Sequence, residues 1–313
     1  MPLVSMVVIT YNSAETVLET LESIKNQTYS NLELIITDDC SSDKTVDICK
    51  AWINENISRF KRVEMVTSPI NTGVSANINR GMFKAQGKWI KGSAGDDLLI
   101  PSAVEEFVNF AENGTDDIRI CVSDVEVFSS REVVPSNIRE MYKNFFELEK
   151  EPYDLQRKRV MYQLVFVGPG FFFRRDLFEE IGGYSEKYGN AEEWPFVYKI
   201  ITNGNRIYAL DKKLILYRYQ PNTLSRKRDD KGLIDKKLFM GTYRHFFDHP
   251  FKDLIKERHY LTAWHYALYY WSCRLQYKID NNKERRLIRH FFSLFSPLAY
   301  IKKIKSIYNS YAK

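Results

Sequence analysis

The chain has 313 residues, enough for one large domain or two smaller ones, and its composition of 44% hydrophobic and 27% charged residues is that of a globular protein. Its four cysteines show no CxxC spacing and no regular ladder, which excludes a zinc ribbon or a disulfide framework as its organising feature and indicates reduced thiols. The net charge of +6 is uneven, because residues 244–313 hold 14 basic and 5 acidic side chains whereas the remainder holds 32 and 35.

Strand-like and helical segments alternate through the first hundred residues. The apolar run at 3–10 predicts a strand buried on both faces, and the segments at 32–37, 62–67 and 88–93 predict three further strands. Apolar side chains at helical spacing predict helices around Val17 to Ile24, around Val46 to Trp52, and over 73–85. This alternation predicts parallel βαβ units and therefore an α/β fold.

Polar side chains follow three of these strands where each strand ends. They are Thr10, Tyr11 and Asn12 after the first, Asp38 and Asp39 after the second, and Asp96 and Asp97 after the fourth. In an open parallel sheet these ends meet at one edge, where ligands bind. Two adjacent carboxylates at that edge raise each other's pKa unless a hard cation such as Mg²⁺ or Mn²⁺ lies between them. The alternative interpretation of the Asp pair is an ordinary surface turn.

Two common nucleotide-binding motifs are absent from the sequence. No GxGxxG follows the first strand and no GxxxxGK[ST] occurs anywhere, which disfavours a dinucleotide-binding fold and a P-loop. A nucleotidyltransferase would carry a Gly-rich basic loop after the first strand, and residues 10–15 lack one.

With these motifs the chain resembles the family-two glycosyltransferases, enzymes of the GT-A fold. The resemblance rests on VSMVVITYN at 4–12, QT at 27–28, LIITDD at 34–39, SSD at 41–43, NTGVS at 71–75, NRG at 79–81, GKWI at 87–90 and the Asp pair at 96–97. It resumes with VGPGFFFRRD at 167–176, FEEIGGY at 178–184 and NAEEWPF at 190–196. It implies a mostly parallel central sheet flanked by helices, and transfer of a sugar, with inversion, from a nucleotide diphosphate.

The resemblance also implies roles for the residues at the strand ends. Thr10, Tyr11 and Asn12 would wall the nucleotide base and ribose, Asp39 would accept a hydrogen bond from the base, and Asp96 would contact the ribose. The expected donor is a UDP-sugar.

The metal motif is reduced in this chain. Asp97 would coordinate the Mn²⁺ or Mg²⁺ ion that bridges the diphosphate, but Ala94 and Gly95 precede the Asp pair, where many relatives have Asp-x-Asp-Asp. Ile78 stands where many relatives carry Arg, so a phosphate contact is expected to be lost or supplied elsewhere.

Further candidates lie in the second half of the chain. Gly168 and Gly170 would let the backbone approach the transferred sugar closely. Arg218 and Arg226 are candidates for contacting the diphosphate, with ordinary solvated charge as the alternative.

Glu193 is the expected catalytic base, with Glu192 as the second candidate. The resemblance aligns Glu193 with a base that is usually Asp in relatives, and an inverting transfer needs one carboxylate to take the proton of the acceptor hydroxyl. Pro195 suits the first turn of a helix, and acidic residues there favour the helix dipole. The alternative is that both acids merely begin a helix.

The sequence predicts a catalytic domain over 1–243 and a helical, basic, aromatic-rich extension over 244–313. Basic residues beside Phe, Leu and Trp predict an interfacial helix on a membrane, with a helical cap on the domain as the alternative. No nucleic-acid recognition module is present.

No apolar run is long enough to span a membrane, and no signal peptide is predicted. The expected location is therefore cytoplasmic or peripheral on the inner face of the plasma membrane. The expected setting is surface-polysaccharide assembly, with a saccharide acceptor on a polyprenyl diphosphate. The rival hypothesis is a non-catalytic nucleotide-sugar binding or scaffold protein.

Overall fold

The computed structural model describes residues 1–114, 117–129, 133–162, 168–220 and 233–296. The chain divides into two compact units, the first made of Met1–Val160 and Leu164–Gln220 and the second of Met161–Gln163 and Pro221–Lys313. The predicted boundary between residues 243 and 244 falls inside helix α9 (Lys236–Asp248), which belongs to the second unit.

The first unit is built on an eight-stranded sheet with the order β3-β2-β1-β4-β7-β6-β8-β5. Its strands are β1 (Val4–Thr10), β2 (Leu32–Asp38), β3 (Val63–Thr67), β4 (Trp89–Ala94), β5 (Leu98–Leu99), β6 (Ile120–Phe128), β7 (Phe171–Arg174) and β8 (Tyr208–Arg218). Strands β1 to β4 are parallel, as are β6 and β8, whereas β7 runs antiparallel to β4 and β6 and β5 runs antiparallel to β8. The prediction of an α/β fold with a mostly parallel sheet is confirmed.

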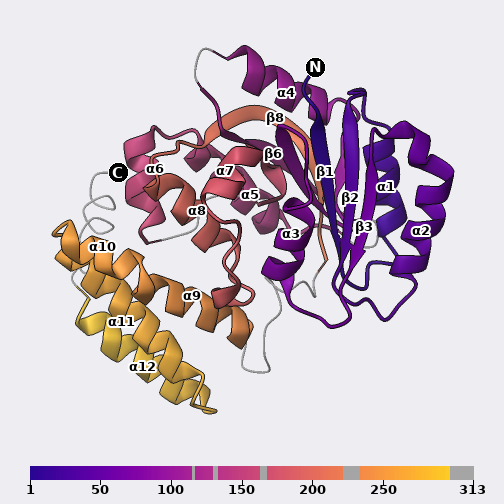
Figure 1. Cartoon of the computed structure of the whole chain (residues 1–313). Coiled ribbons are helices and arrows are strands. Elements are labelled where there is room, and N and C mark those ends of the chain that lie inside the picture. The colour runs from indigo at the N-terminus through magenta and orange to yellow at the C-terminus, as the bar shows by residue number, and fades with distance from the viewer. Residues whose placement is uncertain (115–116, 130–132, 163–167, 221–232, 297–313) are drawn as a thin grey trace. The chain divides into compact units, whose positions relative to one another are not determined.

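Helices cover both faces of the parallel part of this sheet (Figure 1). The helices of the first unit are α1 (Val17–Lys25), α2 (Thr45–Asn56), α3 (Val74–Met82), α4 (Ala103–Asn113), α5 (Ser136–Glu149), α6 (Tyr153–Val160), α7 (Arg175–Glu180) and α8 (Glu193–Thr202). Met6 and Val8 of β1 join a buried cluster with α1 and α2. On the opposite face α3 lies so close that a Cβ on Gly81 would be 2.8 Å from Val7 Cγ1. The continuous apolar pattern of β1 arises from this double covering.

The sequence predicts two strands at 206–209 and 213–219, but these residues form the one strand β8 in the structure, so that prediction is wrong. Strand β8 pairs with β6 along its length, but Leu210 lies opposite Ser123 while Lys213 lies opposite Asp124. The two residues between Leu210 and Lys213 form a bulge, and in the sequence such a bulge resembles the end of a strand. The alternating residues 118–128 predict a strand with an irregularity near Ser123 and Asp124, and the register shift of β6 at these residues confirms it.

A stack of three aromatic rings holds β4 in place beside the site. Trp89 of β4 stacks on Phe172 of β7 at 4.9 Å between ring centroids, and Phe107 of α4 stacks on the same Phe172 at 5.0 Å. All three side chains are at most 1% exposed. This core fixes β4 against β7, and the turn that follows β4 carries Asp96 and Asp97.

The second unit consists of helices α9, α10 (Pro250–Lys256), α11 (Tyr260–Gln276) and α12 (Asn282–Leu294). Its interior is aromatic, with Phe246 of α9 stacked on Tyr270 of α11 at 4.7 Å. Across the described ranges, none of the helices is both long enough and apolar enough to cross a membrane.

Candidate functional site

The ends of β1 and β2 are joined by side-chain hydrogen bonds. Thr10 Oγ1 donates to Asp38 Oδ2 at 2.7 Å, and Ser41 donates to the same carboxylate. Asn12 has a positive φ of 51° and its side-chain oxygen accepts from the Ser42 amide at 2.8 Å. Tyr11, between them, is half exposed. The three predicted base-wall residues therefore lie at one edge of the sheet.

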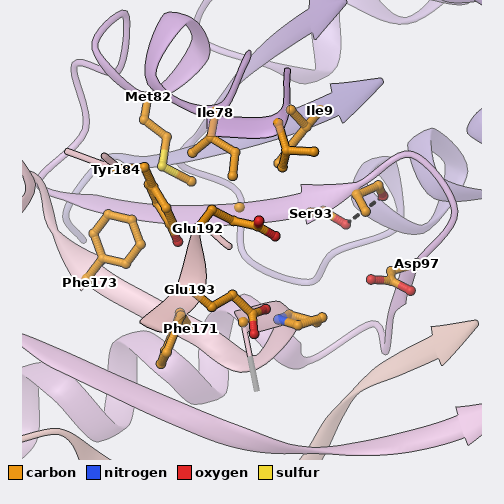
Figure 2. Close-up of a pocket in the computed structure, with 15 residues that line it drawn as sticks. Ile9, Ile78, Met82, Ser93, Asp97, Phe171, Phe173, Tyr184, Glu192 and Glu193 are labelled. Carbon is orange, nitrogen blue, oxygen red and sulfur yellow. Dashed lines mark hydrogen bonds between the residues drawn. The ribbon is translucent and has the colours of Figure 1, made fainter. Parts of the chain in front are cut away.

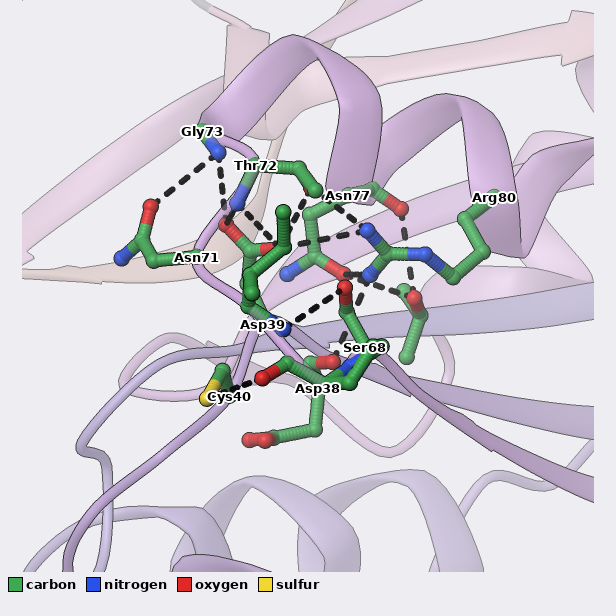
Figure 3. Close-up of polar contacts among 12 residues, drawn as sticks. Asp38, Asp39, Cys40, Ser68, Asn71, Thr72, Gly73, Asn77 and Arg80 are labelled. Carbon is green, nitrogen blue, oxygen red and sulfur yellow. Dashed lines mark hydrogen bonds and ion pairs between the residues drawn. The ribbon is translucent and has the colours of Figure 1, made fainter.

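The Asp39 carboxylate is surrounded by donors from the loop that leads into α3 (Figure 3). It accepts from the amides of Thr72 and Gly73 at 3.0 and 2.7 Å, from the Thr72 hydroxyl at 2.6 Å and from Arg80 Nη2 at 3.2 Å. Although burial acts in the opposite direction, these hydrogen bonds lower the pKa of Asp39. Four donors occupy about as many lone-pair sites as a carboxylate has, so a nucleotide base must displace or share one of them.

A cavity of about 160 Å³ lies beside β4, and two groups of acidic side chains face it (Figure 2). Asp97 comes from the turn after β4, while Glu192 and Glu193 come from the start of α8. The structure therefore brings together the predicted metal ligand and both candidate bases, although about a hundred residues separate them in the sequence.

The Asp97 carboxylate is 1% exposed and only one of its oxygens has a hydrogen bond. Oδ1 accepts from the Arg218 amide at 3.0 Å, whereas Oδ2 is buried without a hydrogen-bond partner among the described residues. Burial and the neighbouring Asp96 carboxylate raise the pKa of Asp97 well above its usual range. A buried carboxylate oxygen without a donor is what a cation site requires.

The residues at this turn fit a divalent cation that takes its remaining ligands from the substrate. No group of three or more His, Cys, Asp or Glu side chains that could hold a metal occurs in the described part of the chain. Mg²⁺ commonly binds through one or two carboxylates together with phosphate oxygens and water. Asp97, with Asp96 beside it, supplies the protein share of such a site.

Arg218, the last residue of β8, is buried against the Asp96–Asp97 turn and does not project into solvent. Its Nε donates to the Asp96 carbonyl oxygen at 2.8 Å and its Nη2 donates to Glu19 at 2.7 Å, while the guanidinium lies 4.6 Å from the centroid of the Phe128 ring. These contacts hold the acidic turn against β8. The predicted diphosphate contact by Arg218 stays a prediction, and Arg226 lies outside the described residues.

The carboxyl groups of Glu192 and Glu193 share one wall of the cavity. Burial raises the pKa of Glu193 to about 7, and burial together with the Glu193 charge raises the pKa of Glu192 to about 8. The two adjacent carboxyl groups therefore hold protons up to near-neutral pH. A carboxylate with a pKa near 7 is matched to accepting a proton at neutral pH.

Gly168 and Gly170 allow the backbone to come close to this acidic pair and to β6. A Cβ on Gly168 would lie 2.2 Å from Glu193 Oε1, and a Cβ on Gly170 would lie 2.5 Å from the Ser123 carbonyl oxygen. The Gly168 amide donates to Glu193, which moderates the rise in its pKa. These glycines thus place a backbone donor beside the candidate base.

Lys91 is a buried cation to which the sequence analysis gave no role. It is 1% exposed, and its Nζ donates to the carbonyl oxygens of Gly92 and Pro169 at 2.6 Å each. Burial lowers the pKa of Lys91 to about 7, and the nearby Asp97 opposes this shift. In the sequence, a lysine inside an otherwise apolar strand is the feature that could have marked Lys91 as a buried, paired residue. Lys91 ties the turn that carries Gly168 to β4 and partly compensates the charge of Asp97.

Replacing Lys91 with Met is expected to weaken the binding of a divalent cation near pH 7. Without the Lys91 charge the pKa of Asp97 rises further, so a larger fraction of Asp97 is protonated and the Mn²⁺ concentration for half-maximal nucleotide binding increases, about tenfold per pKa unit. Raising the pH should offset the effect. Lys88→Met is the control, because Lys88 pairs with Glu112 and does not line the cavity. Equal Mn²⁺ requirements in both variants would contradict the role of Lys91.

The chain matches the family model described as Glycosyl transferase family 2 over residues 5–182. An uncharacterized glycosyltransferase of Haemophilus influenzae is 38% identical over 110 residues, which cover 35% of this chain and 42% of the relative. The uncharacterized glycosyltransferase EpsJ of Bacillus subtilis is 26% identical over 225 residues, covering 72% of this chain and 63% of EpsJ. The matches thus span about two fifths to two thirds of the length of these curated relatives.

Two solved structures share the fold at low sequence identity. Staphylococcus aureus TarS 1–349 in complex with UDP-GlcNAc has a TM-score of 0.61 and 17% identity, covering 94% of this chain and 82% of that chain. The mannosyltransferase PcManGT of Pyrobaculum calidifontis, in complex with GDP-Man and Mn²⁺, has a TM-score of 0.54 and 15% identity, covering 99% and 75%. The predicted GT-A fold is confirmed. Because the family model matches more than half of the chain, the protein belongs to glycosyl transferase family 2.

Proposed function

We propose that this protein transfers a sugar, with inversion, from a nucleotide-diphosphate donor to a saccharide acceptor, with a UDP-sugar as the donor and Mn²⁺ or Mg²⁺ as the cofactor. The observation that carries the proposal is the single cavity between Asp97, whose Oδ2 has no hydrogen-bond partner, and the Glu192–Glu193 pair. Surface-polysaccharide assembly is the proposed setting, and a lipid-linked saccharide is the proposed acceptor. The complex of TarS 1–349 with UDP-GlcNAc supports this choice of donor.

The two acidic groups divide the work of the transfer. Glu193, held by the Gly168 amide, takes the proton of the acceptor hydroxyl as its oxygen forms a bond to the anomeric carbon. The bond between that carbon and the diphosphate breaks on the opposite face, on the side of Asp97. Asp97 would hold a divalent cation, which would offset the negative charge that the leaving diphosphate gains. Arg218 keeps this turn in place through the Asp96 carbonyl.

A thermal-shift screen of UDP, GDP, CMP and their sugars, each with and without Mn²⁺, tests the donor site. A ligand that binds only the native state raises the melting temperature by mass action. We expect UDP and UDP-sugars to raise it and the increase to depend on Mn²⁺. The absence of a shift with every nucleotide would reject the proposed donor site.

The rival hypothesis, a binding or scaffold protein that performs no transfer, makes the same prediction for binding but a different one for turnover. We expect UDP release from the donor to accelerate when a saccharide acceptor is supplied. Tight donor binding with no release of UDP, tested over a panel of acceptors that includes lipid-linked saccharides, would favour the scaffold.

We propose that the second unit docks the protein on an anionic membrane through helix α12. Leu287, Phe291 and Leu294 are 67%, 56% and 48% exposed and follow one another at helical spacing. Lys283 and Arg286 are exposed on the same helix. An apolar stripe beside basic side chains is the pattern of an interfacial helix.

The double variant Phe291→Asp and Leu294→Asp is expected to abolish sedimentation with vesicles that contain phosphatidylglycerol. The carboxylates oppose both the apolar insertion and the attraction to anionic lipid. Leu18→Asp is the matched control, because Leu18 is 49% exposed on α1. Unchanged sedimentation of the double variant, or a dimer in solution that the double variant breaks, would contradict membrane docking by this face.

A further inference from the structure

The cavity between Asp97 and the Glu192–Glu193 pair has the size and position for the transferred sugar, if the proposed function holds. The anomeric carbon must lie between the leaving diphosphate on the Asp97 side and the attacking hydroxyl on the Glu193 side. The volume of about 160 Å³ is well below the roughly 300–1,000 Å³ of sites that hold drug-sized ligands. The cavity therefore accommodates one sugar ring rather than a nucleotide.

One wall of this cavity is aliphatic. Val74, Ile78 and Met82 follow one another at intervals of four residues on α3 and line the cavity together with Ile9 from β1. Figure 2 shows Ile9, Ile78 and Met82 in a row, with the carboxyl groups of Glu192 and Glu193 below them. The side chains of Val74, Ile78 and Met82 carry no hydrogen-bond donor, so this wall offers no hydrogen bond to a sugar hydroxyl oxygen.

An aliphatic wall discriminates between the substituents that a sugar can present to it. A hydroxyl group placed there loses its hydrogen bonds to water and gains none, which weakens binding by roughly tenfold or more. A methyl group at the same place strengthens binding, because burying its apolar surface away from water is favourable. The wall therefore favours a sugar that carries a methyl group.

Glu192 lies beside this wall and further limits which methyl-bearing sugar fits the cavity. Its Oε2 is buried and has no hydrogen-bond partner among the described residues. An acetamido group combines a methyl with an N–H donor and a C=O acceptor, so it pairs with this carboxyl group in either protonation state. A 6-deoxy sugar supplies the methyl group without this adjoining amide.

We propose that the transferred sugar is an acetamido sugar, with its methyl group against Ile78 and Met82 and its amide hydrogen-bonded to Glu192. This inference rests on the proposed function and adds the class of sugar to it. The structure thereby assigns Ile78 as a specificity-determining residue.

The test compares donors that differ only in this substituent. Binding of UDP-GlcNAc and UDP-Glc, and of UDP-GalNAc and UDP-Gal, is measured by calorimetry with Mn²⁺, with UDP alone as the reference. We expect at least one acetamido donor to bind about tenfold or more tightly than its hexose partner. Equal binding within both pairs, or a preference for the plain hexoses or for a 6-deoxy donor, would overturn this inference and leave the proposed function standing. Failure of all four donors and of UDP would reject the proposed function and this inference with it.

Variants of residues in the aliphatic wall test whether this wall causes the preference for acetamido donors. Ile78→Thr places a hydroxyl on the wall with little change in size, and we expect it to reduce the ratio of affinities to about threefold or less while UDP alone binds as before. Ile70→Thr is the control, because Ile70 is 66% exposed and does not line the cavity. Glu192→Leu should reduce the ratio as well, and Glu192→Gln should retain part of it. An unchanged ratio in both Ile78→Thr and Glu192→Leu would place the selectivity outside this wall.

Discussion

Replacing Glu193 with Gln is expected to lower the rate of sugar transfer by roughly 10²- to 10⁴-fold. The amide has nearly the shape of the carboxyl group but cannot take a proton from the acceptor hydroxyl. Binding of the nucleotide should survive, because Asp39 and Asp97 are unchanged. The measurement is the release of UDP from the donor with acceptor present, beside the Mn²⁺-dependent thermal shift with UDP.

The pH dependence of the same reaction assigns the two acids. With the pKa of Glu193 raised to about 7 by burial, kcat/KM should fall about tenfold per pH unit below pH 7, because only the ionised form acts as a base. Glu192→Gln removes the neighbouring carboxyl group, and a midpoint that stays near pH 7 is expected because burial is the main cause of the raised pKa of Glu193. Loss of activity in Glu192→Gln, with activity retained in Glu193→Gln, would show that Glu192 and not Glu193 is the catalytic base.

The stability of these variants provides a check that they are folded. The raised pKa values mean that both carboxyl groups hold their protons more tightly in the folded state than in the unfolded state, where they titrate near 4.5. The free energy of unfolding therefore falls as the pH rises from about 4.5 to about 8. Each Gln variant should melt at a higher temperature than the parent protein at pH 8.

The parallel half of the fold could be predicted from the sequence because its strands alternate with helices and because β1 and β2 are buried on both faces. The apolar runs that form β1 and β2 end at Thr10 and Asp38, and parallel pairing brings these ends to one edge of the sheet. Asp97 lies at the same edge because β4, which it follows, is also parallel to β1. The resemblance of the NAEEWPF motif implied a candidate base at Glu193, and the structure places this residue on the same cavity as Asp97.

The features missed depend on pairings between residues distant in the sequence. The bulge in β8 arises from its register with β6, which no local pattern records. The contact of Arg218 with Glu19 joins segments about two hundred residues apart, so the burial of this charged side chain against the acidic turn could not be read from the sequence. The burial of Lys91 was missed for the same reason, since its partner Pro169 is 78 residues away in the sequence.

Replacing Asp97 with Asn is expected to abolish the Mn²⁺-dependent thermal shift with UDP while making the protein itself more stable. Asn retains an oxygen that can accept from the Arg218 amide, so the turn keeps its hydrogen bond. It removes a buried charge whose pKa is raised, and such a group opposes folding at every pH above its unfolded pKa of about 3.9. The same loss of charge removes the ligand that a divalent cation needs.

The two opposite changes make this variant more informative than one that only loses activity. A variant that melts at a higher temperature yet no longer responds to Mn²⁺ and UDP has lost a site and not its fold, as expected where a protein keeps a destabilising group for function. Asp211→Asn is the control for the change in charge, because Asp211 is 78% exposed and pairs with Lys150 outside the cavity. An Asp97→Asn protein that keeps the full Mn²⁺-dependent shift would show that the cation binds elsewhere. One that melts at a lower temperature would show that the Asp97 charge is stabilised by Lys91 and Arg218 more than burial opposes it.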